Sequence, residues 1–185
     1  MRIARETDNA PRRQDGFSLL EVVIATGVMA GALVTLGQLL ALSVSTTRAA
    51  HALTYTAVLA EQKMEQLRSL AWGFDSQGLP VTDRETDGTG LSQSPPDTLT
   101  SNVNGWVDYV DRFGNALGVG PKPPARTVYV RRWSIEHLPG NADNTIVMQV
   151  LVTPRMNRGA ADAAGSTLRL PGESRLVSVK TRKAP

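Results

Sequence analysis

The chain has 185 residues, with 20 Lys and Arg against 17 Asp and Glu, which gives a formal net charge of +3 at pH 7. It contains no cysteine, so disulfide frameworks, thiolate nucleophiles and thiolate metal sites are excluded. A nucleic-acid partner is not favoured, because the charge excess is small and part of it belongs to the arginine-rich first 16 residues. A chain of this length is expected to form one domain with an appendage.

Residues 1–16 form a polar leader that ends in Gly16, directly before an apolar run. In a secretory signal peptide the small-residue cleavage site follows the apolar region, whereas here the small residue precedes it. Cleavage between Gly16 and Phe17 would therefore remove the leader and leave the apolar helix on the mature protein. Basic residues beside an apolar helix favour the cytoplasmic side of a membrane, and the leader contains Arg2, Arg5, Arg12 and Arg13.

Residues 17–42 are predicted to be a transmembrane helix. Glu21 is the only charged residue among them, and at about 1.5 Å per residue the run can cross the roughly 30 Å hydrocarbon layer. A charge costs about 2.5–3.5 kcal/mol at the bilayer centre and less near the interface, so the Glu21 carboxylate is expected to have a partner. A newly exposed α-amino group on Phe17, with an unperturbed pKa of about 7.7–8.0, would lie one helical turn away.

The sequence G-F-S-L-L-E of residues 16–21, with the apolar residues that follow it, resembles the processing site of type IV pilins and pseudopilins. The resemblance implies that prepilin peptidase cuts after Gly16 and methylates the new amino group of Phe17. It also implies that Glu21 aligns an incoming subunit with the terminal amine of the previous one, since a carboxylate among bundled apolar helices needs an opposite charge. The alternative is that Glu21 is an interfacial residue solvated by lipid headgroups.

Within the predicted membrane helix, Gly27 and Gly31 form a pair of small residues one turn apart. Such pairs let helix backbones approach closely in lipid, so we interpret both as helix-packing positions, although small residues are common in membrane helices in general. Many major pilins have a proline about 22 residues into the mature helix. Gln38 occupies that place here, which favours a minor component.

The helix is predicted to continue to residue 72, because residues 44–71 contain neither Gly nor Pro. Trp72 and Gly73 are expected to end it. Residues 59–68 are similar to a segment of minor pilins of the pilus-modification type and of one minor pseudopilin class, although a generic amphipathic helix has the same spacing. An apolar stripe recurs at three- and four-residue steps and consists of Leu53, Ala57, Ala60, Met64, Leu67 and Ala71.

Residues 73–126 are rich in Gly, Pro, Asp, Ser and Thr, which predicts mostly loop, and the resemblance places the variable αβ-loop of pilins here. Within this segment, residues 106–110 are predicted to form a short strand and residues 111–115 the turn after it. The alternating acids Asp83, Glu85 and Asp87 lack the other ligands of a calcium loop, so they are interpreted as a solvated loop.

Residues 127–185 are predicted to form the sheet region. Strands are expected at 127–137, 145–153 and 175–181, with a hairpin turn at 139–141 and a second loop from Gly159 to Pro171. The residues assigned to the buried faces are Tyr129, Trp133 and Ile135, then Ile146, Met148, Val150 and Val152, then Val177 and Val179. Arg131 interrupts the first face, and Arg131-Arg132-Trp133 is interpreted as edge protection and core rather than as a DNA contact.

The predicted fold is α+β, a pilin-like lollipop in which a long N-terminal helix packs on three or four antiparallel strands. The chain is not expected to be an enzyme, because its only histidines, His51 and His137, belong to no catalytic or metal-binding motif. No cofactor or metal is predicted.

The resemblance, taken with these patterns, implies a minor type IV pilin of the pilus-modification type. The alternatives are a minor pseudopilin of a type II secretion system and an unprocessed single-pass membrane protein with a periplasmic binding domain. The pilin resemblance implies an inner-membrane protein with a cytoplasmic N-terminus and a periplasmic C-terminal domain, which moves into a pilus or pseudopilus. Its expected partners are prepilin peptidase, other pilins or pseudopilins through the N-terminal helix, the inner-membrane assembly platform and membrane lipid.

Overall fold

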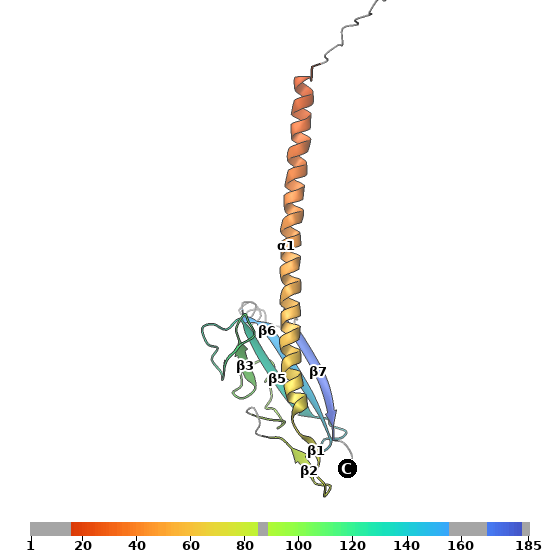
Figure 1. Ribbon diagram of the computed structural model, residues 1–185, viewed down its shortest axis with the longest axis vertical. Coiled ribbons are helices and arrows are strands. Elements are labelled where there is room, and N and C mark those ends of the chain that lie inside the picture. Colours follow the sequence, from red (N-terminus) through yellow and green to blue (C-terminus); the bar gives the residue numbers. More distant parts are fainter. Residues whose placement is uncertain (1–15, 85–88, 156–169, 183–185) are drawn as a thin grey trace, which may run out of the picture. The chain divides into compact units, whose positions relative to one another are not determined.

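The computed structural model describes residues 16–84, 89–155 and 170–182. The chain divides between Ser45 and Thr46 into two compact units. The first unit holds the N-terminal part of one long helix, and the second holds the rest of that helix and two antiparallel sheets (Figure 1). The predictions for residues 1–15, for Glu85 and Asp87 and for most of the second loop lie outside the described residues.

Helix α1 spans Leu19–Ser69 and contains 51 residues. The helix predicted for residues 17–72 is confirmed over most of its length, and it begins two residues later and ends three residues earlier than expected. Ser18 occupies the N-cap position, because its carbonyl accepts the Val22 N–H at 3.2 Å. Serine is among the residues preferred at this position, and no proline interrupts the 51 residues that follow.

The prediction that Trp72 and Gly73 end the helix is wrong, because both belong to a strand. Strand β1 (Trp72–Phe74) pairs with β2 (Pro80–Thr82), and the Trp72 side chain is buried in the core. The last turn of α1 is instead closed by a distant side chain: the Lys180 ammonium donates hydrogen bonds to the carbonyls of Arg68 and Leu70. A cation is favourable where helix carbonyls lack partners, although partial burial lowers the pKa of Lys180.

The main sheet has five antiparallel strands in the order β4-β3-β5-β6-β7. The predicted strands at 106–110, 127–137, 145–153 and 175–181 are confirmed, but the expected total of three or four is too low. Two strands of this sheet come from the predicted loop region 73–126, so the boundary drawn at residue 126 does not separate loop from sheet. The strands are β3 (Val107–Val110), β4 (Ala116–Val119), β5 (Tyr129–His137), β6 (Thr145–Pro154) and β7 (Ser174–Thr181).

The predicted turn at 111–115 joins β3 to β4. The Asp111 carboxylate accepts the backbone N–H groups of Phe113 and Asn115 at 2.7 and 2.9 Å and the Asn115 side-chain amide at 3.0 Å. These bonds, led by the Asn115 side chain, hold the pKa of Asp111 below its usual value. Strand β4 was not predicted, because it has four residues and contains Gly118, whose φ of 141° suits glycine.

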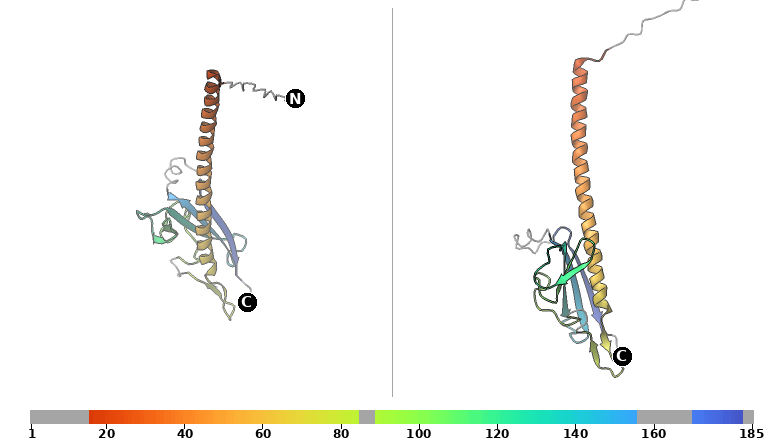
Figure 2. Two further views of the ribbon diagram at one scale, coloured as in Figure 1. Left: turned by 45° about the horizontal axis from the view of Figure 1, so that its top comes forward. Right: turned by 60° about the vertical axis from the view of Figure 1, so that its left-hand side comes forward.

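The C-terminal part of α1 packs on one face of the main sheet (Figure 2). The predicted inward residues of β6 are confirmed, because all four are fully buried. The predicted helix stripe is confirmed at Ala60, Met64 and Leu67, whereas Leu53 and Ala71 are exposed. The helix side of the core is formed by Leu59, Ala60, Met64 and Leu67, and the sheet side by Trp133, Ile135, Ile146, Met148, Val150 and Val152.

The predicted orientation of β7 is wrong. Val177 and Val179 are 59% and 61% exposed on the face away from α1. In the observed register Ser178 lies opposite Met148, and directly opposed residues share a face of the sheet. The polar residues of β7 that face α1 explain this orientation. Ser178 accepts hydrogen bonds from the Arg68 guanidinium, and Lys180, on the same face, caps the end of α1.

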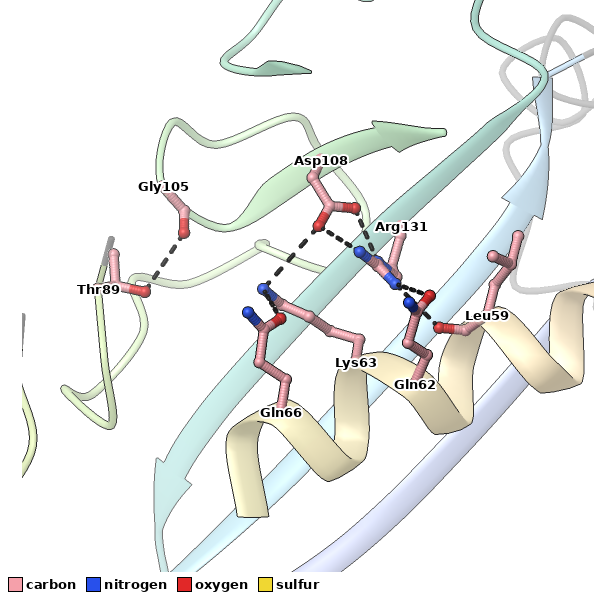
Figure 3. A network of polar contacts seen from close by, with 8 residues as sticks. All are labelled: Leu59, Gln62, Lys63, Gln66, Thr89, Gly105, Asp108 and Arg131. Carbon is pink, nitrogen blue, oxygen red and sulfur yellow. Dashed lines mark hydrogen bonds and ion pairs between the residues drawn. The ribbon is translucent and has the colours of Figure 1, made fainter. Parts of the chain in front are cut away.

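Arg131, the predicted interruption of β5, is part of a buried polar network between sheet and helix (Figure 3). Its guanidinium donates to both carboxylate oxygens of Asp108 at 2.8 Å and to the carbonyl of Leu59 at 3.2 Å. Lys63 extends from α1 to within 3.9 Å of the same carboxylate and lies 3.8 Å from the centre of the Trp133 ring. One buried carboxylate thus faces two buried cations.

The interpretation of Arg131-Arg132 as edge protection is wrong, because β5 is an inner strand between β3 and β6. Arg132 points to the opposite face from Arg131 and donates to the Asn102 side-chain oxygen at 2.9 and 3.0 Å. Both guanidinium groups are more than nine-tenths buried. Both arginines therefore belong to the interior of the second unit and form no exposed basic patch.

Replacing Asp108 with Ala should lower the free energy of unfolding of the second unit by about 3–5 kcal/mol, because it leaves two buried cations without their counter-ion. Denaturant titration of the full chain in detergent, followed by tryptophan fluorescence, reports on this unit because all three tryptophans lie in it.

The matched control for Asp108→Ala is Glu65→Ala, which removes an exposed ion pair with Arg68 whose atoms are 2.6 Å apart. Its cost should be about 0.2–0.5 kcal/mol. Similar losses for the two variants would contradict a stabilising role of the buried carboxylate.

Candidate functional site

The described residues of the first unit form an apolar helical surface. Every residue from Gly16 to Ser45 is exposed in the single chain, and the most apolar 18-residue window of α1 has a mean hydropathy of 2.1 with none of it buried. Monomeric proteins in water rarely expose an apolar surface of this extent. By length and composition this helix is able to cross a membrane.

The hydroxyl groups on this surface bond within the helix. The Thr26 hydroxyl donates to the carbonyls of Val22 and Val23 at 2.9 Å, and the Thr35 hydroxyl donates to the carbonyl of Ala32 at 2.8 Å. In hydrocarbon each polar group must be satisfied internally. These threonines are therefore compatible with lipid, which leaves the Glu21 carboxylate as the one charge on this stretch.

The predicted processing and assembly residues lie together at the start of α1. Gly16 and Phe17 directly precede the helix, Phe17 is 82% exposed, and Glu21 lies in the first turn. Phe17, Glu21 and Ala25 line one shallow groove along the helix surface. Among the described residues the Glu21 carboxylate has no hydrogen-bond or ion-pair partner.

A local role for Glu21 also has to be considered. Ser18 at the N-cap and Glu21 three residues later form the capping-box pattern, and an acid in the first turn interacts favourably with the helix dipole by about 0.3–1 kcal/mol. Glutamine serves at this position of a capping box as well as glutamate does. A test of the assembly role must therefore remove the charge of Glu21 and keep its hydrogen-bonding capacity.

The two glycines predicted as helix-packing positions lie farther along the same helix. A Cβ atom added at Gly27 or Gly31 would meet no atom within 4 Å, so nothing in the single chain requires glycine there. Each glycine costs about 1 kcal/mol relative to alanine in a helix interior. The open space beside this pair is what close approach of a second helix requires.

The two histidines of the chain lie in different places and form no common site. His51 is exposed on α1, whereas His137 lies at the end of β5, with its ring edge against Trp72 at 6.0 Å between ring centres. Within residues 16–84, 89–155 and 170–182, no three His, Asp or Glu side chains gather closely enough to hold a metal ion.

Sequence reasoning missed two features of the second unit. One is the buried network of Asp108, Arg131 and Lys63, and the other is a groove on the sheet face opposite α1. A signal for the network was present, because Asp108 is the only charged residue of the predicted strand 106–110 and Arg131 interrupts the apolar face predicted for residues 127–137. The groove depends on how residues 93–100 fold against the sheet, for which the sequence offers no pattern.

Replacing Gly31 with Leu should reduce association of this helix with neighbouring helices several-fold, because the side chain fills the space that a second backbone would occupy. Gly31→Ala should be tolerated. Association is measured in native membranes by photo-crosslinking from an unnatural residue at Val28.

Gly37→Leu is the matched control for Gly31→Leu, because its added Cβ also meets no atom within 4 Å and its position lies outside the Gly27 and Gly31 pair. Equal effects of leucine at positions 31 and 37 would show that the pair has no special packing role.

Comparison with known proteins gives no match: no family model, no curated protein and no solved structure matches this chain.

Proposed function

We propose that this chain is a minor type IV pilin, a prepilin-like subunit that prepilin peptidase cleaves after Gly16. Its N-terminal helix then enters a type IV pilus or primes the assembly of one. The observation that carries the proposal is the carboxylate of Glu21, which has no partner among the described residues and lies in the first turn of an exposed apolar helix that follows the Gly16-Phe17 junction.

The chemistry of assembly follows from the charge of the cleaved end. Cleavage gives Phe17 an α-amino group that is largely protonated at neutral pH, and methylation of this amine keeps its charge. When the helix of one subunit packs beside that of another, the amine of one meets the Glu21 carboxylate of the other. The ion pair removes the cost of an isolated charge in the apolar bundle and selects one axial register between the helices.

In a pilin of this kind the two units have different tasks. The N-terminal part of α1 first anchors the subunit in the inner membrane, with its leader in the cytoplasm, and later packs in the filament core. The second unit lies in the periplasm and then on the filament surface. Gly27 and Gly31 support this assignment, because they leave open space on a helix whose neighbours are other pilins, the assembly platform or lipid.

A minor pseudopilin of type II secretion would share the N-terminal chemistry. The long segment 73–126 favours the pilin, since the minor pseudopilins that the N-terminal sequence resembles usually have a shorter globular part. In this chain the segment contributes β2, β3 and β4.

The protein extracted from the membranes of its native host should begin at Phe17 and carry one additional methyl group. Intact-mass measurement and N-terminal sequencing test this directly. Gly16→Ala should leave the leader attached, because the peptidase acts at the glycine junction, and Gly27→Ala is the control that should be processed normally. A wild-type chain that begins at Met1 would overturn the proposal in favour of an unprocessed single-pass membrane protein.

Replacing Glu21 with Gln should greatly reduce the amount of subunit in sheared filaments, with unchanged cleavage and unchanged amount in the membrane. The substitution removes the charge that meets the neighbouring amine but keeps a residue suited to the capping box. Quantitative immunoblotting of the filament and membrane fractions gives the ratio.

Glu61→Gln is the control for Glu21→Gln, because it neutralises an exposed acid elsewhere on α1. It should assemble like the wild type. Normal assembly of the Glu21→Gln variant would mean that capping is the whole role of this residue.

A further inference from the structure

The face of the main sheet opposite α1 carries a groove of about 1160 Å³, which we call the outer groove. One wall is the segment 93–100, and the opposite side is formed by β7. The floor includes Ser134 of β5 and Leu151 of β6. None of its lining residues belongs to the N-terminal part of α1, so the groove is separate from the residues proposed to direct assembly.

The wall of the outer groove is held firmly against the sheet. The Ser94 N–H donates to the carbonyl of Ile135 at 2.9 Å, and the Ile135 N–H donates to the Ser94 hydroxyl at 3.1 Å. The segment therefore runs beside β5 where β3 has already ended. Pro95 and Pro96 follow, and their fixed φ angles stiffen the wall.

The outer groove has a negative charge in a chain whose net charge is +3. Its lining contains the carboxylates of Asp97, Glu136 and Glu173 and one guanidinium, that of Arg175, which gives −3 + 1 = −2. Arg175 also donates a hydrogen bond to the Gln149 side chain. The charges of the groove therefore favour a cationic ligand.

A second observation, independent of the acids, also points to a ligand. Ser134 lines the groove, is only 3% exposed, and its hydroxyl has no hydrogen-bond partner among the described residues. A buried polar atom without a partner costs about 1–3 kcal/mol. Among the described residues the side chains of Thr127, Trp133 and Thr153 share this property, but of the four only Ser134 lines the groove. A ligand that presents an amide or carbonyl at this point would satisfy the Ser134 hydroxyl.

The side of the groove at β7 is apolar. Val177 lies there, and it is one of the two β7 valines that turn away from the core. Leu151 is half-buried on the neighbouring strand. A ligand that alternates cationic and apolar side chains on an amide backbone matches the carboxylates, the serine hydroxyl and this apolar strip together.

We infer that the outer groove binds an extended, cationic peptide segment of another protein. Lysine or arginine side chains of that segment pair with Asp97, Glu136 and Glu173, its backbone bonds to Ser134, and its apolar side chains cover Val177 and Leu151. The inference goes beyond the assembly role, because it gives the second unit a binding activity of its own.

The test uses the full chain in a neutral detergent and a fluorescein-labelled hexapeptide of alternating lysine and valine, with binding followed by fluorescence anisotropy. The glutamate–valine hexapeptide is the charge-reversed probe and should not bind. The double variant Asp97→Asn, Glu136→Gln should weaken lysine–valine binding about tenfold, as expected for the loss of two partly solvated ion pairs.

Two further variants make the test specific. Glu61→Gln with Glu65→Gln removes two exposed acids of α1 outside the groove, and it should change the dissociation constant less than about twofold. Ser134→Ala should weaken binding by about threefold to tenfold without lowering the unfolding temperature, because it removes a hydroxyl that has no partner in the free protein.

The inference is overturned if the wild type does not bind the lysine–valine peptide, if both peptides bind equally, or if the groove and control double variants bind alike. Since no filament forms in this assay, its outcome does not depend on processing or assembly.

Discussion

The structure depends on one constraint: a single uninterrupted helix presents an apolar surface on all sides over its first part and is buried on one side only over its last part. Over its first part every residue of α1 is exposed in the single chain and nearly all are apolar, whereas over its last part only one side is buried against the sheet. The two compact units divide between Ser45 and Thr46, and the first buried residue of α1 is Thr56. Because the backbone remains helical throughout, the change from an exposed apolar surface to burial on one side is due to the side chains alone. Glu21 is the only charged residue of the first part of α1, and a charge in an apolar environment is costly unless an opposite charge meets it.

The second unit also contains charged groups in an apolar environment, in this case in its interior. Three charged groups meet where α1 crosses the sheet, and the carboxylate of Asp108 is shared by Arg131 and Lys63. Buried ion pairs often add little net stability relative to apolar residues, but they strongly disfavour any packing that separates the partners. A slip of β5 by one residue would move Arg131 to the opposite face of the sheet. The network therefore fixes both the strand register and the position of the helix on the sheet.

Features that depend on local sequence patterns were predicted correctly. Features that depend on contacts between residues far apart in the sequence were not. Predictions for α1, β5 and β6 succeeded, because their apolar residues recur with helical or strand periodicity. The same rule failed for β7, where the valines face outward because Ser178 and Lys180 bond to the end of α1. The helix end was misplaced for the same reason, since Trp72 is drawn into β1 by burial in the core. At the candidate site, Gly16, Phe17 and Glu21 could be proposed from the sequence because they are neighbours in it, and their roles stay predictions. The outer groove could not be found, because its charges come from positions 97, 136 and 173.

The contact between Lys180 and the end of α1 also has a consequence for the order of folding. The hydrogen bond to Leu70 joins positions 110 residues apart, so the end of the helix is capped by a strand that is synthesised much later. Contacts of such long sequence separation form late, because the intervening chain must be ordered before they are gained. During synthesis the apolar helix therefore emerges well before the sheet that it packs against is complete. Until β7 joins β6, the buried face of the sheet and the inner side of the helix are open to unwanted association. The second unit thus has a vulnerable period that ends only when β7 has emerged from the ribosome and paired with β6.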